Sequence, residues 1–270
     1  MQRPLILITN DDGIDSPGLL ASIAALRSLG DLLIVAPMTQ QTSLSRAFPK
    51  VPDLGKIETR QIPFDGEILE AHALTGSPAF CVSHAVLELA QRPINLCVSG
   101  INYGENLGLS LMPSGTIGAA FEADSYNIPA IAASMEVPSD QHHSNSFNKH
   151  DWSAAINFTR RLAENVLQWG YLRDVAVWNL NIPASATSST PYRFTRQSRQ
   201  NYFVFRKPLR RTLNEPAKLP VEIEIDASTL EPDSDIQCVI IDKCISITPL
   251  TWDLTSIAAL ESREPSLIIK

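Results

Sequence analysis

The chain has 270 residues, of which 44% are hydrophobic and 19% are charged. This composition is typical of a globular protein and excludes a globally disordered chain, a collagen-like repeat and a coiled coil. The 29 aspartates and glutamates outnumber the 22 lysines and arginines, which gives a formal net charge of −7. Because nucleic acids and anionic membranes attract basic surfaces, we expect neither a nucleic acid duplex nor a membrane among the partners of this chain.

Two further features of the sequence indicate a cytoplasmic protein. No apolar run approaches the roughly 18 residues of a membrane span, and the apolar segment after Arg3 is too short for the core of a signal peptide. The four cysteines form no CxxC pair, and we interpret them as reduced packing residues. They are Cys81, Cys97, Cys238 and Cys244.

Strand and helix patterns alternate over the first 182 residues. Continuous apolar runs predict strands that are buried on both faces, at 5–8, 32–35, 94–99, 130–134 and 175–182. Helices are predicted at 17–29, 78–90, 116–126 and 152–169, and the first two begin with a Ser-Pro pair that supplies an N-cap and a first-turn proline. The alternation predicts an α/β fold with a Rossmann-like, mostly parallel sheet sandwiched by helices.

The pattern changes after about residue 184. A linker of small residues leads into strand-like segments with no comparable helix between them, at 202–205, 221–225, 236–240 and 245–248, and then a short helix near 254–260. We expect a β-rich, antiparallel extension whose last strand returns to the core near 246–249. The predicted division is a Rossmann-like catalytic core at 1–184 and a C-terminal arm at 185–270, and 141–150 is expected to be an exposed loop.

Residues 193–211, within this extension, form a basic and aromatic segment. One interpretation is a solvated hairpin or an arm at a subunit interface. The other is a surface that binds phosphate or a charged polymer. The residues alone leave both interpretations open.

Oxygen-bearing side chains follow three of the predicted strands. Asp11 and Asp12 come after the first strand, and Asn102 follows the third. Thr42 and Ser43 lie in the loop after the second strand. In open α/β sheets, ligands bind outside the carboxyl ends of the strands. Adjacent carboxylates repel unless a positive charge neutralises them, and oxygen donors suit Mg²⁺, Mn²⁺ or Ca²⁺; the alternative is that the Asp-Asp-Gly sequence is only a turn.

The segment Ser114-Gly115-Thr116 opens a predicted helix. Free backbone N–H groups and the helix dipole make such a start an anion site, although a plain N-cap is the alternative. Combined with the acidic pair, it indicates a site for a metal ion and a phosphate. Other nucleotide and hydrolase motifs are missing: there is no GxGxxG and no GxSxG, and Leu19-Leu20 stand where a P-loop needs Lys and Ser or Thr.

Nine short segments, in order along nearly the whole chain, resemble the stationary-phase survival protein SurE family of metal-dependent nucleoside monophosphate phosphatases. The matching segments are 6–13, 16–18, 35–37, 76–78, 98–102, 106–108, 114–120, 179–183 and 245–250. The resemblance implies hydrolysis of nucleoside 5′-monophosphates, with 3′-monophosphates and short polyphosphate as further candidate substrates. It also implies a Mg²⁺ or Mn²⁺ cofactor and a homodimer or homotetramer in which the arm is exchanged between subunits.

The resemblance also implies a role for individual residues. The metal ligands it implies are Asp11, Asp12, Thr42 and Asn102, with Ser43 as a neighbouring candidate for the hydroxyl ligand. The phosphate contacts it implies are Asn106, Ser114, Gly115 and Thr116. The catalytic set is then Asp11, Asp12, Asn102 and Ser114, with Asp11 as the first candidate for the general base.

The chain departs from the family pattern in three places. Phe80 precedes Cys81 where the family often has Asp, Glu105 stands where Pro is common, and residues 185–235 match poorly. One alternative hypothesis is a metal- and nucleotide-binding protein of the same fold without catalysis. Another is a receiver-type phosphoacceptor domain, which would need an Asp at the end of the third strand, where this chain has Ser99-Gly100.

Overall fold

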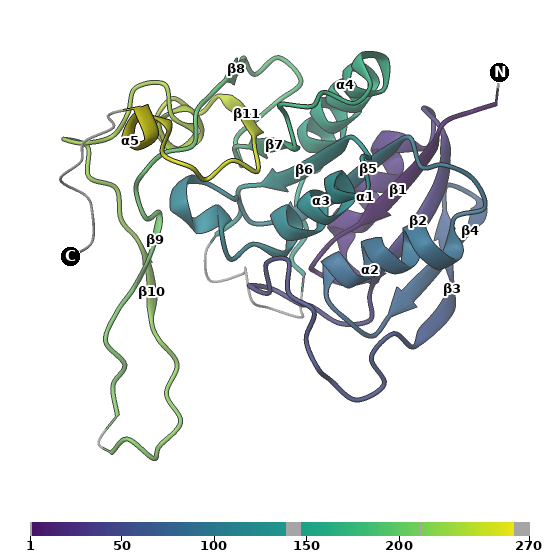
Figure 1. The fold of residues 1–270 in the computed structure, drawn as a ribbon, viewed down its shortest axis with the longest axis horizontal. Helices are drawn as coiled ribbons and strands as arrows, with labels where there is room; N and C mark the ends of the chain where they lie inside the picture. Colours follow the sequence, from purple (N-terminus) through teal and green to yellow (C-terminus); the bar gives the residue numbers. More distant parts are fainter. Residues whose placement is uncertain (1, 139–146, 211, 262–270) are drawn as a thin grey trace.

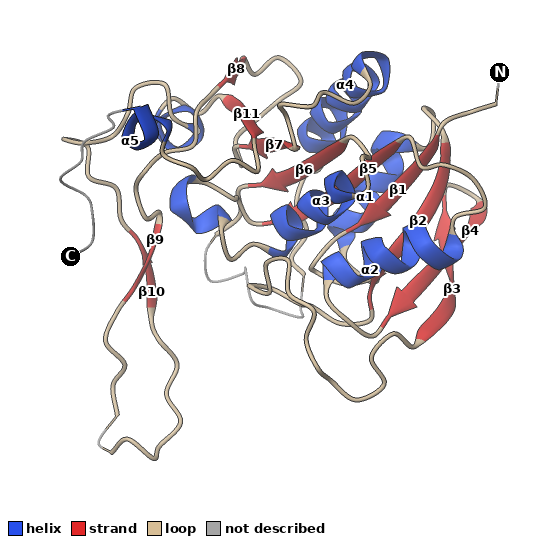
Figure 2. Ribbon diagram, viewed as in Figure 1, coloured by secondary structure: helices blue, strands red, loops and turns tan. Residues whose placement is uncertain are grey.

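The computed structural model describes residues 2–138, 147–210 and 212–261. Its main sheet has nine strands in the order β3-β4-β2-β1-β5-β6-β7-β11-β8 (Figures 1 and 2). These strands are β1 Leu5–Thr9, β2 Asp31–Pro37, β3 Ile57–Phe64, β4 Glu67–Leu74, β5 Leu96–Tyr103, β6 Ala130–Met135, β7 Val177–Ile182, β8 Tyr192–Phe194 and β11 Ile245–Leu250. Among the described strands of this sheet, only the β3–β4 and β7–β11 pairs are antiparallel, so the mostly parallel sheet of the predicted fold class is confirmed.

Helices cover both faces of this sheet. Helices α1 (Pro17–Leu26) and α4 (Ser153–Trp169) pack on one face, and α2 (Pro78–His84) and α3 (Gly115–Ser125) pack on the other. Strand β1 shows why the apolar run is continuous, since Ile6 and Ile8 belong to the first core and Leu7 belongs to the second. Side chains that alternate along a strand must therefore all be apolar when both faces are buried.

The predicted Ser-Pro helix starts are present in the structure. Ser16 Oγ accepts a hydrogen bond from the amide of Leu19 at 3.2 Å, and Ser77 Oγ accepts one from the amide of Phe80 at 3.1 Å. The second helix continues beyond α2 as a π-helical turn at Ala85–Leu89, which brings its end close to the predicted residue 90.

The strand order places a topological switch beside β1. Along the chain β1 is followed by β2, which pairs with one edge of β1, whereas β5 pairs with the other edge. Connections on the two sides of β1 therefore run in opposite directions, and in open α/β sheets ligands bind at such a point, outside the carboxyl ends of the strands. This edge is where the candidate site lies.

The prediction of a strand at 236–240 is wrong. The structure has a π-helical turn at Gln237–Ile241 instead. Two side chains satisfy the amides at its start: Asp235 Oδ1 accepts from the amide of Ile236 at 2.8 Å, and Ser234 Oγ accepts from the amide of Gln237 at 3.2 Å. These local bonds favour a helical turn over an extended strand.

Three strands of the main sheet were not predicted. Strands β3 and β4 form a hairpin around Asp65-Gly66, whose φ angles of +50° and +79° are those of a two-residue turn with both residues left-handed. The third is β8, which pairs with β11 at the end of the sheet. Residues 141–146 of the expected loop at 141–150 lie outside the described residues.

The C-terminal extension contributes both to the main sheet and to a projecting hairpin. Strand β11 pairs antiparallel with β7, with Ser246 opposite Asn181. Strands β9 (Phe203–Phe205) and β10 (Val221–Ile223) form a separate antiparallel pair that extends away from the sheet (Figure 1). Helix α5 (Ile257–Glu261) follows β11. None of the helices in the described parts of the chain has the length and apolar character needed to cross a membrane.

Candidate active site

Asp11 and Asp12 lie in the turn that follows β1. Asn10 shapes this turn, since its amide group donates to the Gly13 carbonyl at 3.0 Å and its carbonyl oxygen accepts from the Gly13 amide at 3.1 Å. Gly13 has a φ of +98°, a conformation that glycine adopts without strain. The Asp-Asp-Gly sequence does form a turn, which was the alternative interpretation of this segment. Both carboxylates are nevertheless buried, with exposed fractions of 3% and 5%. A plain surface turn does not explain this burial.

Asp11 is held between the start of α3 and the loop after β2. Its Oδ1 accepts a hydrogen bond from the Thr116 hydroxyl at 2.6 Å. Its backbone carbonyl accepts from the amide of Gln41 at 2.7 Å, which brings the loop that carries Thr42 to the acidic pair. A methyl group on Gly115 would lie 2.8 Å from Cβ of Asp11, so only glycine lets the helix approach the carboxylate this closely.

Asp12 faces the end of β5. Its Oδ2 accepts from the backbone amide of Tyr103 at 2.9 Å, and its Oδ1 accepts from the Gln40 side chain at 3.2 Å. Asn102 is the neighbour of Tyr103, and its side-chain nitrogen donates to the Gly104 carbonyl at 2.7 Å. Asn102 and Asp12 therefore meet at the end of β5, and the Asn102 side chain is held by the Gly104 carbonyl.

Burial makes the acidic pair costly to ionise. It raises the pKa of Asp11 from its ordinary value of 3.8 to about 6, while the Thr116 hydroxyl and nearby backbone amides act in the opposite direction. Burial, followed by the negative charge of Asp11, raises the pKa of Asp12 to about 7. Ion pairs found in the described parts of the chain involve neither carboxylate.

The chemistry of these donors fits a hard divalent cation. Within the described residues no three His, Cys, Asp or Glu side chains gather in a cluster that could hold a metal ion, so a cation here would need neutral oxygen ligands as well. Thr42, which is half-buried, and Asn102 carry neutral oxygens in the adjoining loops. Two buried, uncompensated carboxylates with neutral oxygens beside them match the ligand preference of Mg²⁺ or Mn²⁺ rather than that of zinc.

The acidic pair should make the metal-free protein less stable as the pH rises. In the unfolded chain both carboxyls ionise near 3.8, but in the folded chain they ionise near 6 and 7, so between these values the native state binds more protons. Stability therefore falls from about pH 4 to pH 7, by an amount on the order of 6 kcal/mol. Urea unfolding in chelator at pH 5 and pH 7.5 checks this, with an Asp11→Asn/Asp12→Asn double variant as the control. An equal pH dependence in the two proteins would contradict it.

Asn106 is fixed to the ends of β6 and β7. Its amide nitrogen donates to Ser134 Oγ at 2.9 Å, and its backbone amide donates to Asn181 Oδ1 at 2.8 Å. Its backbone carbonyl accepts from both Asn179 and Asn181 at 3.0 Å. Ser134 is the register partner of Asn102 on β5, so this network lies beside the acidic edge. One amide hydrogen of Asn106 remains for an anion.

Ser114 caps α3, as the sequence indicated. Its Oγ accepts from the amide of Ile117 at 3.2 Å, which leaves the hydroxyl hydrogen to donate elsewhere. The Thr116 hydroxyl donates to Asp11, so this side chain also orients the acidic pair. The loop after β2 packs against the same helix start, since the Ser45 amide donates to the Pro113 carbonyl at 2.9 Å. Arg46 in this loop pairs with the buried Glu122 at 2.5 Å.

Several residues of the site were missed by the sequence analysis. They are Gln40, Tyr103, Ser134, Asn179 and Asn181. The two asparagines had a detectable signal: they are two residues apart on a buried strand, so they face the same side, and buried amides need partners. The amide of Tyr103 gave no signal, because any residue supplies a backbone N–H.

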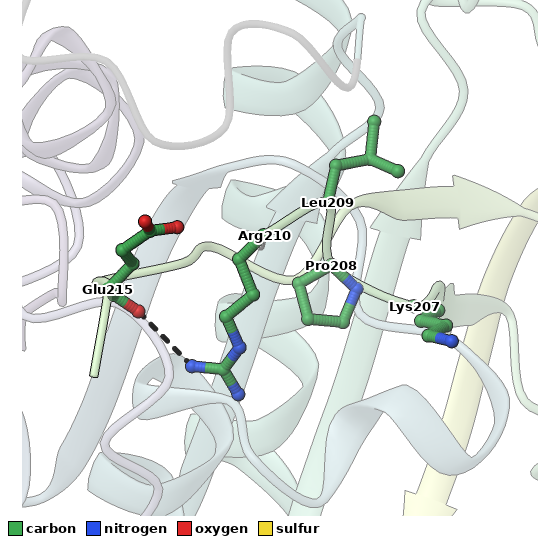
Figure 3. A pocket seen from close by; sticks show the side chains of 5 residues that line it. All are labelled: Lys207, Pro208, Leu209, Arg210 and Glu215. Carbon is green, nitrogen blue, oxygen red and sulfur yellow. Dashed lines mark hydrogen bonds between the residues drawn. The ribbon is translucent and has the colours of Figure 1, made fainter. Parts of the chain in front are cut away.

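A separate surface hollow lies on the arm, in the loop that joins β9 to β10. It has a volume of about 820 Å³ and is lined by Lys207, Pro208, Leu209, Arg210 and Glu215 (Figure 3). Arg210 is oriented by the backbone carbonyl of Glu215 at 3.3 Å. Nearer the base of the arm, Arg206 pairs with Glu222 and Glu224 at 2.7 and 2.5 Å. These acidic partners neutralise part of the basic segment and favour a hairpin over a polymer-binding surface.

The fold and the site together define an α/β protein whose acidic, oxygen-rich site lies at the switch point of a mostly parallel sheet. A family model described as survival protein SurE matches residues 6–204, and the chain belongs to this family.

Relatives and a solved structure agree with this assignment. The chain is 34% identical over 256 residues to the 5′-nucleotidase SurE of Methanothrix thermoacetophila, a match that covers 93% of this chain and 94% of that protein. It is 40% identical over 184 residues to the 5′-nucleotidase SurE of Methanosphaera stadtmanae, covering 68% and 70%. The crystal structure of the SurE protein from Aquifex aeolicus superposes with a TM-score of 0.74 at 26% identity, covering 96% of this chain and 98% of that one.

Proposed function

We propose that this chain is a metal-dependent 5′-nucleotidase that hydrolyses nucleoside 5′-monophosphates to nucleoside and phosphate. The relatives that it matches over nearly their full length carry this activity in their names. The observation that carries the proposal is the buried Asp11–Asp12 pair, which has no cationic partner among the described residues. A pair that is costly to keep charged is retained where a bound cation compensates it.

Asp11, Asp12, Thr42 and Asn102 are the proposed ligands, with Ser43 as the alternative to Thr42. When bound, Mg²⁺ or Mn²⁺ supplies positive charge at the phosphate and lowers the pKa of a water molecule. Thr116 holds Asp11 in one orientation, and the Tyr103 amide and Gln40 do the same for Asp12. These bonds fix the carboxylates before substrate arrives.

The phosphate group is proposed to lie against Asn106, Ser114, Gly115 and Thr116. Ser114 contributes its hydroxyl hydrogen and Asn106 contributes its remaining amide hydrogen. Gly115 and Thr116, whose backbone amides bond to Asp11, form the start of α3 against which the phosphate would lie. Donors held in this way act where negative charge accumulates during phosphoryl transfer. Asp11 remains the first candidate for the general base, and Asp12, Asn102 and Ser114 complete the catalytic set.

We also propose that residues 1–184 carry catalysis and that residues 185–270 serve oligomerisation before returning to the core. The arm exposes apolar side chains that a solvated hairpin would not need, which supports a homodimer or homotetramer. They are Phe205, Leu209, Leu213, Leu219, Val221 and Ile223. Light scattering of the purified chain measures the assembly directly.

Phosphate release from a panel of substrates tests the activity. The panel contains nucleoside 5′- and 3′-monophosphates, short polyphosphate and 4-nitrophenyl phosphate, with Mg²⁺, with Mn²⁺ and with chelator. We expect release from 5′-monophosphates that requires the cation and stops in chelator. A folded protein that binds Mg²⁺ and a nucleotide but releases no phosphate from any substrate would overturn the proposal and favour the binding protein without catalysis. The family assignment gives no support to a receiver domain.

A further inference from the structure

A short segment connects the proposed phosphate site to the base of the arm. We call residues 104–110 the Asn106 loop, and residues 196–203 together with 234–239 the arm base. The loop runs from the end of β5 through the 3₁₀ turn Gly108–Leu111 and carries Asn106 near its middle. The sheet holds it on one side and the arm base holds it on the other, so neither part of the molecule alone determines where Asn106 lies.

On the sheet side, hydrogen bonds saturate the backbone of Asn106. Asn181 exchanges two bonds with its amide and carbonyl, and Asn179 adds a second bond to the carbonyl. The side chains of Asn179 and Asn181 are fully buried, which excludes water as a competitor for these bonds. The bonds from Asn179 and Asn181 therefore fix the position of the Asn106 backbone relative to β7.

On the arm side, Asp235 joins the loop to the arm base. Its carboxylate is fully buried and accepts from the amide of Gly108 at 3.0 Å and from the amide of Ser198 at 2.9 Å. The Leu109 amide donates to the Gln200 carbonyl at 2.9 Å. A methyl group on Gly108 would lie 2.6 Å from that same carbonyl oxygen, so the two backbones are in direct contact.

The most direct connection is the hydrogen bond between Glu105 and Tyr202. Tyr202 Oη donates to Glu105 Oε1 at 2.8 Å, and the two side chains have exposed fractions of only 1% and 3%. Burial and the negative charge of Glu105 raise the pKa of Tyr202, so the phenol keeps its proton and acts as the donor. The Tyr202 ring also packs with Leu107, Ile236 and Val239 in a small core of its own. These contacts place Glu105 and Leu107, the residues on either side of Asn106, on the arm base.

We propose that Tyr202, through Glu105, is a positioning residue that holds Asn106 against the substrate phosphate. The proposal rests on the proposed function and adds to it a dependence of phosphate binding on the arm base. The Tyr202 hydroxyl bonds to Glu105, whereas Asp11 and Asp12 accept side-chain and backbone bonds from Thr116, Gln40 and Tyr103, so we expect cation binding not to depend on Tyr202. The chain continues from Tyr202 into the arm. A partner that binds the arm would therefore act on the position of Asn106 through the bond between Tyr202 and Glu105.

The test compares Tyr202→Phe with Tyr192→Phe, a control that removes a phenol hydroxyl from an exposed ring on β8. Affinity for inorganic phosphate is measured by calorimetry in Mg²⁺, together with Mg²⁺ affinity and with KM and kcat for a 5′-nucleotide. For Tyr202→Phe we expect phosphate affinity to fall and KM to rise by about tenfold, the effect of losing one buried hydrogen bond, with Mg²⁺ affinity unchanged. Glu105→Gln keeps an acceptor for Tyr202 and should stay close to the parent protein, whereas Glu105→Ala should behave like Tyr202→Phe.

The outcomes separate this proposal from the proposed function. Loss of thermal stability in Tyr202→Phe with unchanged phosphate affinity and KM would overturn the positioning role and leave the nucleotidase intact. If the parent protein binds phosphate but hydrolyses no substrate, the ratio of the phosphate affinities of Tyr202→Phe and the parent still decides the positioning role. If the parent protein hydrolyses a 5′-nucleotide but binds inorganic phosphate too weakly to measure, the ratio of the KM values of Tyr202→Phe and the parent decides the positioning role. Should Tyr202→Phe not fold, Glu105→Ala against Glu105→Gln gives the same comparison from the other partner.

Discussion

Asp12→Asn is expected to reduce phosphate release by at least about 10³-fold while making the metal-free protein more stable. The loss of activity follows because asparagine removes one of the two charges that would compensate the cation. The gain in stability follows because burial and Asp11 raise the pKa of Asp12 to about 7, so ionising it in the folded chain is unfavourable. Removing that ionisable group should raise the free energy of unfolding at pH 7.5 by about 1 to 3 kcal/mol.

Opposite effects on activity and stability are what distinguish a ligand from a structural residue. Asp15→Asn is the matched control, because Asp15 lies three residues further along and its side chain is exposed. Phosphate release, Mg²⁺ titration calorimetry and urea unfolding in chelator are measured on both variants. If Asp12→Asn binds Mg²⁺ as tightly as the parent, or if it is less stable than the parent without metal, the assignment of Asp12 as a ligand is wrong.

Local patterns in the sequence were sufficient to predict most of the core. The run from Leu5 to Ile8 is apolar at every position because β1 is buried on both faces, and the Ser-Pro pairs cap helices as their chemistry requires. The hairpin of β3 and β4 was missed although its turn, Asp65-Gly66, is a typical hairpin sequence. Its strands are half-exposed and contain no continuous apolar run, so the signal that marks the buried strands is absent from them.

The sequence was sufficient to predict where the site lies in the fold, but not which side chains contact one another in it. The rule that ligands bind at the carboxyl ends of parallel strands predicts that Asp11, Asp12 and Asn102 lie close together. The structure places all three residues at that edge of the sheet. The bond between Thr116 and Asp11 was not predictable, because it depends on how closely α3 approaches β1. That approach is a tertiary property, and its trace in the sequence is the single residue Gly115.

Gly118→Ala is expected to destabilise the protein and lower its activity, although it replaces a glycine inside a helix by alanine. In the interior of α3, alanine normally stabilises a helix by about 1 kcal/mol relative to glycine. Here a methyl group would overlap the backbone carbonyl of Ser45 and crowd the amide of Arg46. Helix α3 is packed on the sheet, so the loop must give way. We expect a loss of about 2 to 3 kcal/mol in the free energy of unfolding and a fall in activity of about 10²-fold.

The fall in activity follows from what the loop carries. Moving Ser45 away from α3 breaks its bond to Pro113 and strains the pair between Arg46 and Glu122, and Thr42 lies only three residues before Ser45. Gly66→Ala is the control, because a methyl group there meets nothing within 4 Å although φ is +79°. It should cost about 1 kcal/mol of stability from backbone strain and leave activity unchanged. If Gly118→Ala is instead more stable and fully active, the loop is not held against α3, and Thr42 has no fixed place beside the acidic pair.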